Sequence, residues 1–280
     1  MHPRLRRCAT GSRASALSPR LTPWATSPED FINSYLAAKT ATLPEVRDFI
    51  AHYPAALLPI GATEQHGPHL PLTTDTLLAE AFVHRVAQKS CGLVLPALPF
   101  GYSWTWRDIP GTLTLRFETF TELIRDVAES VTRYGVKALC IVTGHEANRS
   151  PLKYALREKI ADQVPLKLLH LFYPGMHDIL EEAESRAWQG ELLHAEEVET
   201  SLMLAQHPEL VRMGLAEADY PDIPELYGAS VVTMGDIMRT GIFGDATVAS
   251  AEKGRRWLEL STDRAAALWT GFLDTHGIAH

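Results

Sequence analysis

The chain has 280 residues, of which 46% are hydrophobic and 21% charged, a composition typical of a soluble globular enzyme with a large core. Its formal net charge of -8 argues against a nucleic acid partner, and no apolar run approaches the roughly 20 residues that span a bilayer. Cys91 and Cys140 stand in apolar surroundings, so we expect reduced core thiols of a cytoplasmic protein rather than a disulfide framework.

Residues 1–28 differ from the rest of the chain. They contain five arginines and no acidic residue, and they lack the apolar centre of a secretory signal. This composition would suit a transit peptide, but a disordered extension is the simpler interpretation. We therefore expect one domain over residues 29–280, since no repeat or linker divides that stretch.

After this segment, apolar residues recur with helical and strand periods in alternation. A helix is expected to begin at Ser27, with Phe31, Tyr35 and Leu36 on its apolar face. Further helices are expected from residue 43 and at residues 77–89, 117–134, 150–161, 178–186, 202–205 and 250–273. Short apolar runs predict strands at residues 55–60, 93–98, 138–142 and 166–172. Residues 215–241 are weakly periodic and are expected to form a long loop bordering a pocket.

Strands that alternate with helices of ~10–15 residues predict an α/β fold, in which helices cover both faces of a parallel sheet. Folds of this class place their active sites at the carboxyl ends of the strands. The polar segments that follow strands are therefore the first place to look for chemistry.

Acids and imidazoles gather in three such segments. Glu64, His66 and Asp75 follow the strand at 55–60, and His145 and Glu146 follow the strand at 138–142. The third group precedes the helix at 202–205 and consists of His194, Glu196, Glu197 and Glu199. Mixed oxygen and imidazole donors suit Zn, Mn or Fe(II). Two such ions ~3.5–4 Å apart, bridged by a carboxylate, would polarise a carbonyl and generate hydroxide near neutral pH.

Each segment alone also has a simpler interpretation. A Glu-x-His pair occurs by chance, His66 and His69 would bond loop backbone, and Asp75 would cap the next helix. The expected convergence of all three segments on one edge of one sheet favours the metal site.

Four motifs resemble those of one family. The segment 59–71, PIGATEQHGPHLP, followed by Thr74-Asp75, is similar to the signature of the creatininase (creatinine amidohydrolase) family. Pro110-Gly111-Thr112, Gly144-His145-x-x-Asn148 and the segment 194–202 match further motifs in the same order. The resemblance covers roughly residues 55–208 well and the C-terminal helix loosely.

The resemblance implies a three-layer α/β/α fold with a mostly parallel sheet, a dinuclear metal centre and a homohexamer. It implies that a metal-bound hydroxide attacks a small cyclic amide, formamide or related substrate and that a carbon–nitrogen bond is cleaved. The chain would then be an amidohydrolase, a hydrolase acting on carbon–nitrogen bonds other than peptide bonds, with a small molecule as its partner.

The resemblance also assigns roles by position. Glu64 and His145 would hold one metal and His66 the other, with Asp75 between them. The family's usual place for the last carboxylate ligand is Ala147 here, so Glu199 is expected to supply it, with Glu146 and Glu197 as alternatives. His194 matches the general acid/base histidine that protonates the leaving nitrogen. Glu197 is the second candidate catalytic residue.

The residues that would surround the substrate depart from the family pattern. Thr105-Trp106 stands where a Glu-His pair recurs, and Glu146 replaces one member of an aromatic pair near the substrate. The metal ligands are retained while these positions differ, so creatinine itself is not the expected substrate. Ser103, Trp106 and Glu146 are the candidate substrate-binding residues, although loop packing is the simpler interpretation of the tryptophan.

Two other kinds of function remain open. A related hydrolase would cleave a different bond, opening a carbocycle or maturing a peptide. A catalytically silent oligomer would keep the fold as a scaffold, and it would have no need for ~2 bound metals per chain.

Overall fold

The structure, a computed structural model, describes residues 35–160, 163–186 and 194–280. Its centre is a five-stranded sheet in the order β1-β3-β2-β4-β5, with every neighbouring pair parallel. The strands are β1 (Tyr35–Ala37), β2 (Ala55–Ile60), β3 (Gly92–Val94), β4 (Ala138–Thr143) and β5 (Lys167–Leu171). A separate antiparallel pair consists of β6 (Ala218–Asp219) and β7 (Gly244–Asp245).

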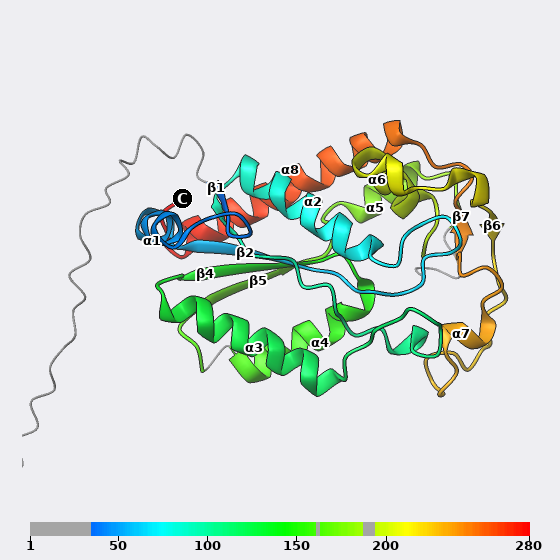
Figure 1. Cartoon of the computed structure of the whole chain (residues 1–280), viewed down its shortest axis with the longest axis horizontal. Coiled ribbons are helices and arrows are strands. Elements are labelled where there is room, and N and C mark those ends of the chain that lie inside the picture. Colours follow the sequence, from blue (N-terminus) through cyan, green and yellow to red (C-terminus); the bar gives the residue numbers. More distant parts are fainter. Residues whose placement is uncertain (1–34, 161–162, 187–193) are drawn as a thin grey trace, which may run out of the picture.

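Helices cover both faces of the sheet (Figure 1). One face carries α2 (Thr74–Lys89), α5 (Met176–Glu182), α6 (Glu197–Gln206) and α8 (Ala251–Thr275). The other carries α1 (Leu43–His52), α3 (Phe117–Arg133) and α4 (Arg149–Tyr154), which continues as a π-helix at Ala155–Ile160. A short helix, α7 (Met234–Ile237), lies at the end of the molecule near β6. This is the three-layer α/β/α sandwich that the resemblance implies.

The central strand β2 separates two hydrophobic cores. Leu57 packs among residues of α2, α6 and α8, whereas Leu58 packs among residues of α1 and α3. Successive residues of a strand point to opposite faces of the sheet, and helices cover both faces here, so both side chains are buried. A strand buried on both faces reads as a continuous apolar run, which explains why the sequence predicts β2 correctly.

Two expected elements differ in the structure. The helix expected over Tyr35 and Leu36 is wrong there: these residues form β1, which pairs with β3 at the sheet edge. β3 ends at Val94, earlier than expected, because Pro96 has no N–H to continue the ladder. Residues 1–28 and the expected helix start at Ser27 lie outside the described residues.

Two helices begin earlier than their apolar periods suggest. α2 begins at Thr74 rather than residue 77, so Asp75 lies in its first turn. α6 begins at Glu197 rather than residue 202, so Glu197 and Glu199 lie on a helix and not in a loop. The carboxylates of both first turns are near the positive end of a helix dipole.

Within the described ranges, Cys91 and Cys140 are buried and free, as expected. No helix among those residues is both long and apolar enough to cross a membrane.

Gly254 lets α8 pass very close to α6. A Cβ at this position would lie 1.8 Å from the backbone oxygen of Ser201, so the backbone of α6 would have to move. We expect Gly254→Ala to lower the free energy of unfolding by about 1–3 kcal/mol, the usual effect of overpacking.

Gly271, in the same helix, is the matched control. A Cβ there meets no atom within 4 Å, so Gly271→Ala should raise the free energy of unfolding by up to ~1 kcal/mol through helix propensity. Urea denaturation of both variants measures the two effects. Equal effects would contradict the close contact between α6 and α8.

Candidate metal centre

The acidic and imidazole side chains meet at the carboxyl ends of β2 and β4. Glu64 and His66 lie in the loop after β2, and His145 follows β4. Asp75, on α2, comes close to the same edge: a Cβ on Gly144 would lie 2.3 Å from the Asp75 backbone oxygen, so glycine is needed there. Parallel strands place the segments that follow them side by side, which brings these residues together although they are far apart in the sequence.

Two groups of potential metal ligands share Asp75. One consists of Glu64, Asp75 and His145, the other of His66, Asp75 and Glu199, and the ligand atoms within each group lie within 4.8 Å of one another. Asp75 Oδ1 is 3.1 Å from His66 Nε2, and Asp75 Oδ2 is 3.0 Å from His145 Nδ1. One carboxylate thus faces two imidazoles, an arrangement suited to a bridging ligand.

The start of α6 places Glu199 in this site. Its Oε2 accepts a hydrogen bond from the backbone N–H of Ala195 at 2.6 Å and lies 3.8 Å from His66 Nε2. Glu196 caps the helix by accepting from the Val198 N–H at 2.9 Å. Ala195 has a positive φ of 53°, so the chain turns sharply between His194 and the helix.

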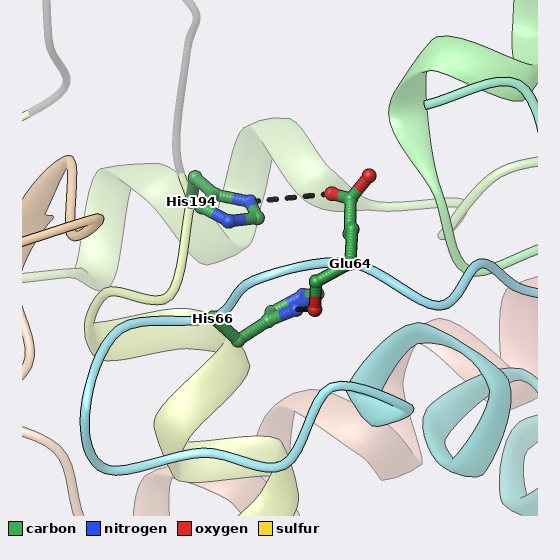
Figure 2. Close-up of side chains that lie close together, drawn as sticks. All are labelled: Glu64, His66 and His194. Atoms are coloured by element: carbon green, nitrogen blue, oxygen red, sulfur yellow. Dashed lines mark hydrogen bonds and ion pairs between the residues drawn. The ribbon is translucent and has the colours of Figure 1, made fainter. Parts of the chain in front are cut away.

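His194 approaches the same group from a different segment. Its Nδ1 is 3.8 Å from Glu64 Oε1, and its ring centroid is 4.5 Å from that of His66. Figure 2 shows the Glu64 carboxylate turned toward the His194 ring, with His66 extending from the same loop as Glu64. Glu64, His66 and His194 form a third group of close ligand atoms.

The buried carboxylate oxygens of Glu64, which lack hydrogen-bond donors in the described part of the chain, show whether these residues are suited to metal ions. Both of its carboxylate oxygens are buried and accept no hydrogen bond from the residues that the structure describes. The nearest imidazole nitrogens are His145 Nε2, 3.4 Å from Oε2, and His194 Nδ1, 3.8 Å from Oε1. A buried carboxylate that has such contacts but accepts no hydrogen bond is suited to binding a cation. The donor set, three carboxylates and two imidazoles, therefore fits a pair of divalent ions.

The charges of the site shift the pKa of its members in a consistent way. Burial lowers the pKa of His66, but the attraction of Asp75, Glu199 and Glu64 outweighs it and raises that pKa to about 10. His145 follows the same pattern, since Glu64 and Asp75 outweigh burial and raise its pKa to about 9. Burial raises the pKa of Glu64 to about 7, against the lowering effect of His145. In the absence of cations, protons on the imidazoles balance the carboxylates.

Metal binding should therefore displace protons. At pH 7 we expect binding of Zn²⁺ to the metal-free protein to release ~2–3 protons per chain, because a ligating imidazole must be neutral and a ligating carboxylate must be ionised. Since the imidazole pKa values lie above neutrality, metal affinity should rise as the pH rises toward 9. Calorimetric titration with ZnCl₂ in buffers of different protonation enthalpy measures this number.

His66→Gln is the matched control and should release about one proton fewer, because it removes one of the two basic imidazoles. Zinc binding without any proton release would contradict the charge state described above.

Two predicted site residues lie elsewhere. Glu197 is fully buried on the α8 side of α6, where Lys253 Nζ lies 2.6 Å from Oε1 and the Ser185 N–H donates to Oε2 at 2.6 Å. Glu146 is largely exposed and pairs with Arg149 at 3.0 Å. Neither belongs to a group of close ligand atoms among the described residues.

The other two candidates lie beside histidines of the site. Ser103 is fully buried, and its Oγ is 3.5 Å from His145 Nε2. Trp106 is 3% exposed and stacks on His194, with ring centroids 4.7 Å apart. Both come from the loop after β3, which the sequence predicts to face the site.

Two residues near the site escaped the sequence analysis. The backbone oxygen of Gln65 accepts a 2.7 Å hydrogen bond from His194 Nε2, a contact that no side-chain pattern reveals. Tyr173, after β5, is buried with a positive φ of 31°, and its hydroxyl has no partner among the described residues. Burial, with the nearby charges of Asp75 and Glu199, raises its pKa well above the usual range. Tyr173 follows a predicted parallel strand, and that position alone could have indicated that it lies near the site.

The sequence of the chain is similar to one protein family and to several known enzymes. Residues 39–269 match the family model Creatininase, described as creatinine amidohydrolase. The chain is 31% identical to creatinine amidohydrolase of Pseudomonas putida, over 73% of this chain and 84% of that protein. It is 30% identical to a mycofactocin precursor peptide peptidase of Mycobacterium ulcerans, over 78% and 86%. A third relative, 3-dehydro-scyllo-inosose hydrolase of Thermotoga maritima, is 27% identical over 80% and 79%.

Solved structures agree with these relatives. A mutant creatininase of the Zn-Zn type superposes with a TM-score of 0.70 at 28% identity, covering 84% of this chain and 96% of that chain. A manganese creatininase gives the same TM-score and identity, with 84% and 97% covered.

Proposed function

The chain belongs to the creatininase family, and we propose that it is a metal-dependent amidohydrolase of a small cyclic amide, formamide or related substrate. It is an enzyme, a hydrolase acting on carbon–nitrogen bonds other than peptide bonds. The observation that supports the proposal best is the pair of ligand groups that share Asp75 and lie beside His194.

We propose the metal ligands that the family resemblance implies, and the close ligand groups support them. Glu64 and His145 would hold one divalent ion, His66 and Glu199 the other, and Asp75 would bridge them. The names of the two solved relatives favour zinc or manganese, and Fe(II) accepts the same donors. When bound, the two ions would activate water and polarise the scissile carbonyl.

His194 is the proposed proton carrier. Burial, with the charge of His66, lowers its pKa well below the usual value, so the ring is neutral before the reaction, the form that a general base must have. Its Nε2–H donates to the Gln65 oxygen, which leaves the lone pair on Nδ1, the nitrogen that faces Glu64. Nδ1 would take a proton during attack on the carbonyl and pass it to the leaving nitrogen.

The roles of the remaining candidates follow from their positions. Ser103 is fully buried with its Oγ 3.5 Å from His145 Nε2, so we propose that it positions that imidazole rather than binds substrate. The exposed position of Glu146 allows contact only with a substrate that reaches the surface, and Glu197 is proposed to stabilise α6 through Lys253.

A hydrolysis screen tests the substrate class. Metal-reconstituted protein is incubated with succinimide, 2-pyrrolidone, hydantoin, creatinine and N-formylglycine, and ring opening or deformylation is followed by mass spectrometry. We expect turnover of a cyclic amide or formamide, and slower turnover of creatinine. Turnover confined to creatinine would contradict the proposal.

The relatives also point to two other candidate substrate classes, a peptide and a carbocycle. A peptide peptidase and a carbocycle hydrolase cover most of the chain at 30% and 27% identity. A short peptide library and a cyclic polyol ketone therefore belong in the same screen. Cleavage of peptides alone would favour a peptidase, and cleavage of the ketone alone would favour a carbocycle hydrolase.

We also propose a cytoplasmic homo-oligomer, a hexamer by family resemblance. The two buried free cysteines suit a reducing compartment. Light scattering of the purified protein measures the assembly, and a mass near 31.0 kDa, that of one chain, would contradict it.

A further inference from the structure

The His194 ring is held from more than one side. Its Nε2 bonds the Gln65 oxygen at 2.7 Å, and its backbone oxygen accepts from the Phe243 N–H at 2.9 Å. The Gln65 side chain is itself fixed, because its amide donates to the Gly241 oxygen at 3.0 Å and accepts from the Gly67 N–H at 2.9 Å. These contacts fix where the ring is attached and where one of its nitrogens lies.

Trp106 stacks on the His194 ring, whereas the rings of His66 and Phe243, with centroids 4.5 Å and 6.5 Å away, meet it at steeper angles of 41° and 64°. The Trp106 ring plane lies at 29° to that of His194, and it meets Phe243 edge-on with centroids 5.7 Å apart. Together with Met234 and Phe243 it forms a small hydrophobic cluster separate from the two main cores. The Thr105 hydroxyl accepts from the Met234 N–H at 3.1 Å and ties α7 to this cluster. Only 3% of Trp106 is exposed, so little of its surface is left for a substrate.

The stacking restrains a rotation that a single hydrogen bond does not. The second side-chain torsion of histidine has a broad energy minimum, so the ring plane can tilt about an anchored Nε2. A flat indole against the imidazole restricts that tilt and keeps Nδ1 directed at Glu64, 3.8 Å away.

We propose that Trp106 is a positioning residue for proton transfer, which keeps the His194 ring in the orientation that directs Nδ1 toward the reaction. This role rests on the proposed function of His194, and it replaces substrate binding as the role of Trp106. An aromatic side chain at position 106 is therefore required for turnover rather than for substrate affinity.

The first test does not depend on activity. Metal-reconstituted protein is treated with diethyl pyrocarbonate, and modification of His194 is timed by peptide mass spectrometry. Trp106→Leu, which fills space without stacking, should be modified about three- to tenfold faster, the factor expected for loss of one aromatic stack. Trp106→Phe should stay near the wild-type rate.

Trp104→Ala is the control, because Trp104 packs under Arg107 and makes no ring contact with His194 among the described residues. Equal rates in the Leu and Phe variants would overturn the proposal.

The second test is a double-mutant cycle on succinimide, or on whichever compound of the screen is turned over. Trp106→Leu should lower kcat about tenfold with KM unchanged, and it should cause no further loss in a His194→Ala background. Additive losses, or a raised KM with kcat unchanged, would overturn the proposal. If the wild-type protein turns over none of the compounds, the proposed function fails, and the modification rates alone decide on the position of Trp106.

Discussion

Asp75→Ala is expected to reduce bound metal from ~2 ions per chain to less than one and to slow hydrolysis by ~10³-fold or more. Asp75 belongs to the ligand groups of both proposed metal sites, so its loss weakens both of them. Two metal ions stabilise the charge of a transition state by several kcal/mol, and each 1.36 kcal/mol is a factor of ten in rate. Metal content is measured by elemental analysis and turnover on the best substrate of the screen. His66→Ala should change both quantities in the same direction.

Three other carboxylates serve as controls for this result. Glu146→Ala should keep both metals, because its carboxylate is exposed and paired with Arg149. Glu199→Gln should lose metal, whereas Glu197→Gln should retain it and lose stability, because Glu197 neutralises Lys253. Thermal unfolding of each variant shows whether it folds. Full activity and unchanged metal content in Asp75→Ala would rule out a shared ligand.

His194→Ala is expected to lower kcat by ~10²–10⁴-fold while leaving the metal content unchanged, the range typical for loss of a general acid or base. The ring is buried, neutral and anchored to Gln65, with Nδ1 facing Glu64, so its proposed role is to transfer a proton rather than to bind metal.

Substrates with different leaving nitrogens make this second prediction specific. The loss should be greatest for the most basic leaving amine, because that nitrogen depends most on protonation. Loss of metal in His194→Ala, or a kcat equal to that of the wild type, would contradict the assignment.

The sequence predicts the central sheet and the convergence of the site residues at one of its edges, because both depend on local sequence patterns. β2 and β4 are buried on both faces, so their apolar runs are unmistakable, and the polar residues after them must lie at one edge of the sheet. Glu64, Asp75 and His145 come together for this reason.

The side of α6 that each glutamate faces is harder to predict from the sequence. With α6 expected to begin at residue 202, Glu197 and Glu199 both lie in a loop, and only the family resemblance favours Glu199 as the ligand. Because α6 begins at Glu197, these two side chains point ~200° apart around its axis, and only Glu199 lies beside His66. β1 was missed because a three-residue edge strand has no period of its own, and pairing with β3 decides its conformation.

The place of Trp106 depends wholly on tertiary contacts. Its neighbours Phe243, Met234 and His194 are distant in the sequence, so only the folded chain brings the ring onto His194. A loop tryptophan in the sequence alone is equally compatible with packing, with substrate contact and with positioning of a histidine.

The central claim, a two-metal site built on Asp75, is tested most directly by counting metal in the wild-type protein. Protein reconstituted with Zn²⁺ or Mn²⁺ and freed of excess ions is measured by inductively coupled plasma mass spectrometry, alongside Asp75→Ala. The account predicts ~2 ions per wild-type chain and less than one in the variant. A wild-type chain that is catalytically active with no bound metal, or a variant that keeps both ions, would contradict it.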